Sequence, residues 1–344
     1  MFNSFPGWAL ILMYVVLAVA LCLLSKKLAD YVDALDKKTK ISGAFIGGVL
    51  LAAVTSLPEL FTSISATILL PDSASLVVGN ILGSNLFNIA ILGLCFILFF
   101  KKFINGTFEF KSHFTVIIGT YFIYAVVSYG LLANESLQPI VGPINFLALL
   151  ILLIYAGTIF LQPKESEDEE EKEDNYDLTI KQIVIRFIIC AVLLVAVSIF
   201  ITYDTDALSA QYGIDKTTAG AIFLAIATSL PELVSSLALC KKGNWNAAVG
   251  DIVGSCLFNF CIIGLAEFMS FRVSILPGFT TIEALDFQSF KMIYLALIVL
   301  FILSLCLFIK SRLPQEKQNT IGFKIYLIVT GVLLIAGYAI FLII

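Results

Sequence analysis

Two apolar stretches of this chain are almost copies of each other, and they lie 173 residues apart. Residues 47–60 read GGVLLAAVTSLPEL, and residues 220–233 read GAIFLAIATSLPEL. Each is followed by a second matching stretch, VGNILGSNLFN at 78–88 and VGDIVGSCLFN at 249–259. The chain therefore contains an internal duplication, and its fold has to present the same pair of segments twice.

The duplicated stretches place an acid and a proline in the middle of apolar segments. Glu59 and Glu232 would lie at membrane depth, where a charged group is costly and usually functional. Pro58 and Pro231 each remove one helical hydrogen bond, which frees a carbonyl one turn earlier. Paired apolar segments interrupted by proline, in corresponding halves of a chain, point to the binding site of a transporter.

The composition of the chain is typical of a protein that crosses a membrane several times. Apolar residues make up 60% of it and charged residues 13%, whereas a soluble domain carries about 25% charged residues. A helix needs about 20 apolar residues to span a bilayer. The apolar runs predict an all-α polytopic membrane protein with ten transmembrane helices, at about 8–24, 41–70, 75–100, 114–133, 139–161, 180–201, 217–239, 246–270, 290–309 and 321–343.

The distribution of basic residues predicts which way the chain crosses the membrane. Cytoplasmic loops carry an excess of Lys and Arg. If the N-terminus is outside, all of the 21 basic residues except Lys216, Arg272 and Lys291 fall on the inner side. We therefore expect N-out and C-out. Five helices then form each half, so the second half enters the membrane upside down, as an inverted-topology repeat.

The duplication also predicts how the chain is divided. We expect a first five-helix half at 1–161, with its repeat at about 47–88, and a second half at 180–344, with its repeat at about 220–259. Between them, residues 162–179 form an acidic cytoplasmic linker. Runs of like charge repel and stay solvated, so a flexible linker is one interpretation, and a weak cation-sensing segment is the other.

The residue types near the glutamates favour hard cations. Ser84 and Asn88 are four residues apart, as are Ser255 and Asn259, so each pair lies on one helix face. Hydroxyl, amide and freed carbonyl oxygens together with two carboxylates suit Ca²⁺ and Na⁺. Two Glu neutralise one Ca²⁺, and several Na⁺ could compete for the same oxygens. The alternative for the Ser and Asn side chains is simple hydrogen bonding between helices.

These motifs resemble those of the calcium/cation antiporter superfamily, the sodium/calcium exchangers, whose two alpha repeats the TSLPE and GSxxFN stretches match. The resemblance implies that Glu59 and Glu232 bind Ca²⁺ and that Thr55 and Thr228 add backbone carbonyls. The further metal ligands that it implies, for the flanking Na⁺ sites and the final ligand positions, are Ser56, Ser229, Ser84, Ser255, Asn88, Asn259, Ala52 and Ala225.

Three residues depart from the usual pattern of that superfamily. Asn259 stands where many microbial members have Asp, and Cys256 replaces the more usual Asn of GSN. Asp251 replaces the more usual Asn of the GN pair, and we expect it to have a structural role near a helix N-terminus, where the helix dipole favours an acid. The alternative for Asp251 is a charge in a cytoplasmic vestibule.

The sequence predicts an antiporter that exchanges Na⁺ for Ca²⁺ by alternating access, in the cell membrane (plasma or inner). A Ca²⁺/H⁺ antiporter that uses the same glutamates is the nearest alternative, and a passive cation channel is a third. We expect no enzyme and no cofactor, because the chain has no phosphate-binding Gly loop and no HExxH. The expected partners are Ca²⁺, Na⁺ or H⁺ and the lipid bilayer, with no nucleic acid and no nucleotide.

Overall fold

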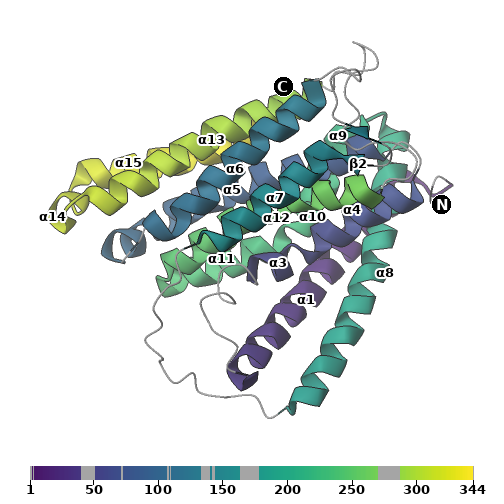
Figure 1. Cartoon of the computed structure of the whole chain (residues 1–344), viewed down its shortest axis with the longest axis horizontal. Coiled ribbons are helices and arrows are strands. Elements are labelled where there is room, and N and C mark those ends of the chain that lie inside the picture. Colours follow the sequence, from purple (N-terminus) through teal and green to yellow (C-terminus); the bar gives the residue numbers. More distant parts are fainter. Residues whose placement is uncertain are drawn as a thin grey trace.

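Helices make up nearly all of the computed structural model in Figure 1, which describes residues 2, 4–39, 51–70, 73–106, 108, 110–132, 140–141, 144–162, 178–269 and 287–343. The elements of the first half are α1 (Gly7–Thr39), α3 (Leu51–Thr55), α4 (Leu57–Leu69), α5 (Ala74–Asn105), α6 (Phe110–Leu132), β1 (Ile140–Val141), β2 (Ile144–Asn145) and α7 (Phe146–Phe160). Those of the second half are α8 (Ile180–Tyr212), α9 (Lys216–Ala219), the π-helix η3 (Gly220–Leu224), α10 (Ala225–Thr228), α11 (Leu230–Lys242), α12 (Trp245–Met269), α13 (Phe287–Arg312), α14 (Gln315–Gln318) and α15 (Ile321–Ile343).

Seven of the helices in the described part of the chain are long and apolar enough to cross a membrane, and they lie in α1, α5, α6, α8, α12, α13 and α15. A bent pair makes an eighth candidate, because 216–228 and 230–242 meet at an angle of 47°. Two shorter apolar helices are α4 and α7. The prediction of an all-α polytopic membrane protein is confirmed. Residues 41–50 of the second predicted helix, and most of the acidic linker, lie outside the described residues.

Three predicted helix boundaries differ clearly from the structure, and one of them is the helix predicted at 180–201, which continues to Tyr212. The helix predicted from residue 139 begins at Phe146, because β1 and β2 precede it as a small antiparallel pair in which Ile140 faces Asn145. Ile and Val favour strands, and the intervening sequence Gly142-Pro143 is typical of a turn. The first helix extends to Thr39, well past the apolar run at 8–24. An apolar run indicates only the part of a helix that lies inside the bilayer, and the helix itself can continue beyond it.

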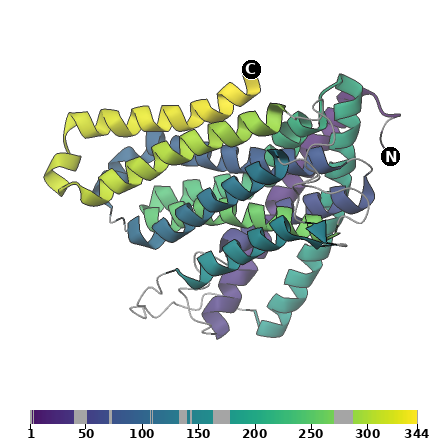
Figure 2. The same cartoon turned by 45° about the horizontal axis from the view of Figure 1, so that its top comes forward.

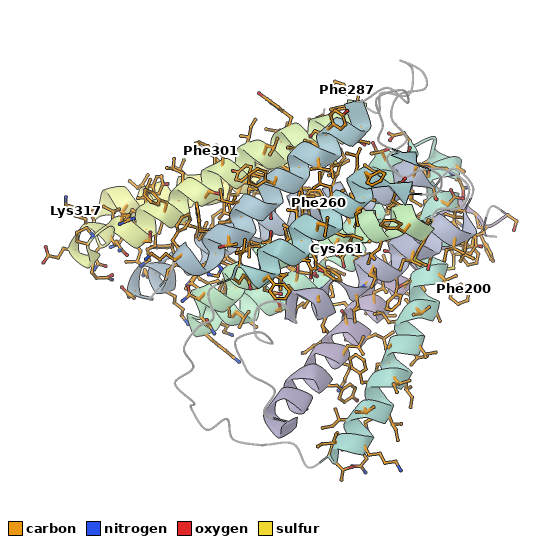
Figure 3. The ribbon with its side chains drawn as sticks, in the orientation of Figure 1. Phe200, Phe260, Cys261, Phe287, Phe301 and Lys317 are labelled. Carbon is orange, nitrogen blue, oxygen red and sulfur yellow. The ribbon has the colours of Figure 1, made fainter. Side chains whose placement is uncertain are left out.

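The paired helices α1 and α8 lie side by side at one edge of the bundle, whereas α5 and α12 cross near its centre (Figures 1 and 2). Helix α15 packs on α5, and the corresponding helix of the first half, α7, packs on α12. Side-chain burial follows the same contrast, since Phe260 on α12 is fully buried and Phe301 on α13 is 63% exposed. Both residues are labelled in Figure 3. The last helix of each half thus packs against the central helix of the other half.

Glycines allow helix α5 to lie directly on the backbone of α9 and η3. A Cβ atom on Gly83 would stand 2.5 Å from Ala221 Cα, and one on Gly79 would overlap the Thr217 carbonyl. From the other side, a Cβ atom on Gly220 would stand 2.8 Å from the Asn80 nitrogen. Small residues allow such close approach of helices in membranes. This contact fixes the start of the broken segment of the second half against the helix that carries Ser84 and Asn88.

Candidate cation-binding site

The two TSLPE stretches form the same broken helix. In the first half, α3 ends at Thr55 and α4 begins at Leu57, with Ser56 between them at φ −89° and ψ 11°. In the second half, Ser229 separates α10 from α11 at φ −89° and ψ 8°. The proline follows in the first turn of the new helix each time, where its missing N–H costs nothing. Because the two backbone conformations agree within a few degrees, both copies place their Glu in the first turn of α4 or α11.

The two breaks meet through a reciprocal pair of hydrogen bonds. The Ser56 hydroxyl donates to Glu232 Oε1 at 2.8 Å. The Ser229 hydroxyl donates to Glu59 Oε1 at 2.9 Å. Each half therefore supplies the donor for the carboxylate of the other half, and the two glutamates lie on opposite sides of one small polar region.

These carboxylates are fully buried and only partly hydrogen-bonded. Glu59 and Glu232 are both 0% exposed, and Oε2 of each has no hydrogen-bond partner within the part of the chain that the structure describes. An ionised carboxylate in such a place is expensive unless a positive charge compensates it. The free Oε2 atoms are therefore the first candidates for cation ligands.

A second cluster of oxygens lies between α3 and α12. The Thr55 hydroxyl lies 3.2 Å from the Ala52 carbonyl, 3.3 Å from Asp251 Oδ1 and 3.4 Å from the Ser255 hydroxyl. Ser255 also donates to the Ala52 carbonyl, at 3.4 Å, and Ser235 donates to the other oxygen of Asp251. Asp251 is 0% exposed, so in this conformation it lies inside the bundle and not in an open vestibule.

The central helices contribute amides from both halves. Asn259 Nδ2 on α12 donates to Asn85 Oδ1 on α5 at 2.9 Å. Asn85 Nδ2 in turn donates to the Cys256 carbonyl at 3.3 Å, and Cys256 Sγ lies 3.7 Å from the Asn85 carbonyl. Asn85 and Cys256 are the corresponding residues of the two GSxxFN stretches, so they join α5 and α12 where the duplicated segments cross.

All of the predicted site residues except Thr55, at 2%, and Ala52, at 1%, have no exposed surface. Hydrogen-bond contacts connect nine of them to the other half: Ser56, Ser229, Glu59, Glu232, Thr55, Ser255, Ala52, Asn259 and Asp251. The Thr228 hydroxyl bonds within its own helix, to the Leu224 carbonyl at 2.9 Å and the Ala225 carbonyl at 3.4 Å. The side-chain atoms Ser84 Oγ, Asn88 Oδ1 and Asn88 Nδ2 are buried with no partner among the residues described.

Asn85 and Ser235 take part in the site although neither was predicted from the sequence. The sequence feature that could have identified Asn85 is its position in the repeat: it stands in the first copy where the second copy has Cys256. Ser235 lies three residues after Glu232, as Thr62 does after Glu59, and Thr62 accepts a hydrogen bond from Asn80 at 3.2 Å. Since Asn80 corresponds to Asp251, the duplication itself predicts the pairing of Ser235 with Asp251.

The arrangement can bind a hard cation. In the described residues, no three His, Cys, Asp or Glu side chains gather into a metal site; instead, two acids combine with hydroxyl, amide and carbonyl oxygens. Oxygen ligands of mixed charge are those that Ca²⁺ accepts in proteins. Both acids belong to helices that break next to them, so a small change in either break moves a ligand.

A family model described as sodium/calcium exchanger protein matches the chain over residues 8–162 and 182–344. The putative antiporter CaxA of Alkalimonas amylolytica is 27% identical over 273 residues, which cover 78% of this chain and 81% of CaxA. The inner membrane protein YrbG of Escherichia coli is 28% identical over 303 residues, or 86% of this chain and 84% of YrbG. The sodium/calcium exchanger MaX1 of Methanosarcina acetivorans is 23% identical over 270 residues, or 68% of this chain and 75% of MaX1.

Two kinds of solved exchanger share this fold. The sodium-calcium exchanger NCX_Mj matches with a TM-score of 0.57 and 21% identity, over 97% of this chain and 96% of that one. The H⁺/Ca²⁺ exchanger CAX matches with a TM-score of 0.65 and 15% identity, over 99% of this chain and 91% of that one. With its apolar spans and these relatives, the chain is a multi-pass protein of the cell membrane.

Proposed function

Because the chain belongs to the sodium/calcium exchanger family, we propose that it is a secondary antiporter that exchanges Na⁺ for Ca²⁺. The observation that carries this proposal is the reciprocal pair of Ser–Glu bonds, which leaves one buried oxygen free on each glutamate. Two carboxylates match the charge of one Ca²⁺. Na⁺ ions bound to the same oxygens and the flanking hydroxyls would displace it.

Exchange, rather than leak, follows from the cost of an empty site. Without a cation, the two carboxylates would have to remain charged and unpaired in the low dielectric of the bilayer interior while the site changes its access. When Ca²⁺ or Na⁺ is bound, the charge of the site is neutralised, and the free-energy cost of changing access from one side of the membrane to the other falls. The proposal makes the chain a carrier with Ca²⁺ and Na⁺ as its substrates, and neither an enzyme nor a protein with a resident cofactor.

We further propose that the chain has the ten-helix, 5+5 inverted arrangement with both termini outside. The seven long spans, the bent pair and the shorter helices α4 and α7 support the number. The matching contacts of α15 with α5 and of α7 with α12 support the repeat. Both termini lie at the end of the bundle away from α14 (Figures 1 and 2), as expected if they share one side. Two related halves that exchange roles provide alternating access.

The coupling cation has a second candidate. The observation that favours H⁺ is Asn259, whose amide is bonded to Asn85 where an acid is usual. With one charge fewer at that helix, the glutamates could trade Ca²⁺ for protons, as an H⁺-coupled exchanger does.

Flux through the reconstituted protein separates the two candidates. Liposomes loaded with Na⁺ are diluted into Na⁺-free buffer with ⁴⁵Ca²⁺, with and without a protonophore. Uptake that needs internal Na⁺ and survives the protonophore supports Na⁺ coupling. Uptake that instead follows a pH gradient without Na⁺ would assign the chain to H⁺ coupling, and flux far above carrier turnover would indicate a channel.

A further inference from the structure

Asp204 is a buried acid that does not belong to the site formed by Glu59 and Glu232. It lies in the membrane-spanning helix α8 and is 0% exposed. Both of its carboxylate oxygens lack a hydrogen-bond partner among the described residues. In the first half, an equal offset of 173 residues leads to Tyr31, so the acid has no counterpart there. A buried polar group without a partner demands an explanation, and an ionisable one inside a membrane is a functional candidate.

The surroundings of Asp204 are apolar. One turn further along the same face of α8 are Ala207 and Leu208, which pack with Phe2 and Leu10 in a separate hydrophobic cluster. Tyr14 of α1 packs against this same cluster, one turn from Asp204 along α8. A hard metal cation needs about six oxygen ligands, and the two hydroxyls of Tyr14 and Thr205 are too few to supply them. A proton needs no such shell.

Charged groups lie on several of the elements packed against α8, and none of them is hydrogen-bonded to Asp204 in the described structure. From α9, Lys216 forms a salt bridge with Asp206 at 3.2 Å. From α4, the acid is Glu59, which accepts a hydrogen bond from Ser229. The π-helix η3, with the sequence GAIFL, contains no titratable side chain. Helix α1 carries Tyr14 near its start, against the Ala207 and Leu208 cluster, and carries Lys26, Lys27 and Asp30 in its later part. No basic side chain of these elements is therefore paired with Asp204 in the described structure.

Tyr14 connects Asp204 to the broken helix of the second half. Its hydroxyl donates to the Phe223 carbonyl in η3 at 2.9 Å, and its ring packs edge-on against that of Phe223. On the other side of η3, the Tyr338 hydroxyl of α15 donates to the Ala221 carbonyl at 2.9 Å. A π-helix leaves main-chain carbonyls without their regular partners and often marks a functional site. Two tyrosines from flanking helices thus hold the segment that leads to Ser229 and Glu232.

We propose that Asp204 is a proton-binding site, separate from the paired glutamates, whose proton keeps Tyr14 bonded to η3. When the proton leaves Asp204 for water, the carboxylate becomes the stronger acceptor, since charge-assisted hydrogen bonds exceed neutral ones. The Tyr14 hydroxyl then turns from the Phe223 carbonyl to Asp204, and no other bond changes. This loosens η3 and shifts the position of Glu232, so the occupancy of Asp204 tunes cation binding. The inference adds to the proposed function and is independent of which cation drives exchange.

Infrared difference spectroscopy of the reconstituted full-length protein tests the site itself. Protons are the probe: spectra are recorded while the pH is raised. As the pH rises, the wild type is expected to lose an infrared band of a protonated carboxyl group. The Asp204→Asn variant should lack this band at every pH. Asp206→Asn is the matched control, because Asp206 lies on the same helix, is partly exposed and is already paired with Lys216. A band that persists in Asp204→Asn, or that disappears in Asp206→Asn, would overturn the proposal.

Transport tests the connection to Tyr14. The Ca²⁺ concentration for half-maximal uptake is measured while the pH is changed on each side of the membrane in turn. On the side that reaches Asp204, we expect the wild-type value to change by about two- to tenfold, the factor that one hydrogen bond provides. Asp204→Asn and Tyr14→Phe should both lose this change, and Asp206→Asn should keep it. If Tyr14→Phe responds to pH as the wild type does, Tyr14 is not the link.

The two proposals fail in distinguishable ways. Glu59→Gln removes a ligand of the proposed exchange site and should abolish uptake, yet the Asp204 band in the infrared spectrum should remain. If the band is present and no Ca²⁺ transport occurs in the wild type, the proposed function is wrong and the proton site stands. If transport occurs and the band is missing, only the proton site is refuted.

Discussion

The reciprocal Ser–Glu bonds predict that Ser56→Ala and Ser229→Ala impair Ca²⁺ binding to the same extent. Each change removes a hydroxyl that donates to a buried carboxylate, at 2.8 Å in one case and 2.9 Å in the other. A hydrogen bond to a charged group contributes about 1.5–3 kcal/mol, and about 1.4 kcal/mol corresponds to tenfold in affinity. The apparent affinity for Ca²⁺ should therefore fall by about ten- to a hundredfold in each variant, since the carboxylate loses its orientation and the site loses an oxygen.

The assay is ⁴⁵Ca²⁺ uptake into liposomes at a series of Ca²⁺ concentrations. Ser304→Ala is the control, because the Ser304 hydroxyl bonds to the Leu300 carbonyl of its own helix, at 2.7 Å and far from the breaks. It should leave the affinity within about twofold, as expected for a change away from the site. A wild-type affinity in either Ser56→Ala or Ser229→Ala would refute the reciprocal arrangement, and very unequal losses would refute its symmetry.

Three further changes test the packing and the second oxygen cluster. Gly83→Ala should destabilise the protein by about 1–3 kcal/mol through overpacking against η3, seen as a lower melting temperature in detergent, while Gly157→Ala, with nothing within 4 Å of the added Cβ, should not. Asp251→Asn should weaken Ca²⁺ uptake and lower the melting temperature, since it disturbs the bonds from Thr55 and Ser235; unchanged uptake affinity would limit Asp251 to a structural role. Lys310→Met should lower stability by about 1–3 kcal/mol with transport retained, because it removes the bonds to two carbonyls at the end of α5; a normal melting curve would contradict this.

The sequence was sufficient for the local features of the site. A proline two residues after a serine in an apolar run predicts the break, and the break occurs at Ser56 and Ser229 with nearly the same backbone angles. The burial of Glu59 and Glu232 also agrees with the prediction, because the flanking apolar residues set the depth of the acid in the membrane.

The contacts between the halves could not be predicted in the same way. That Ser56 bonds to Glu232, and not to its own Glu59, depends on how the break of the first half meets helix α11 of the second. The role of Asn85 depends on the crossing of α5 and α12. The π-helix η3 is invisible to hydrophobic periodicity, since it requires the glycine contact with α5 and the tyrosine hydroxyls from distant helices. Such features are tertiary, and they override what the local sequence indicates.

Equilibrium binding of ⁴⁵Ca²⁺ to the purified protein tests most directly the claim that the two glutamates form one cation site. The wild type, Glu59→Gln, Glu232→Gln and the control Asp206→Asn are compared at the same pH without Na⁺, and Na⁺ is then titrated in. We predict Ca²⁺ binding in the wild type and the control, its displacement by Na⁺, and its loss in both Gln variants. Wild-type Ca²⁺ affinity in either Gln variant would contradict a shared site at Glu59 and Glu232.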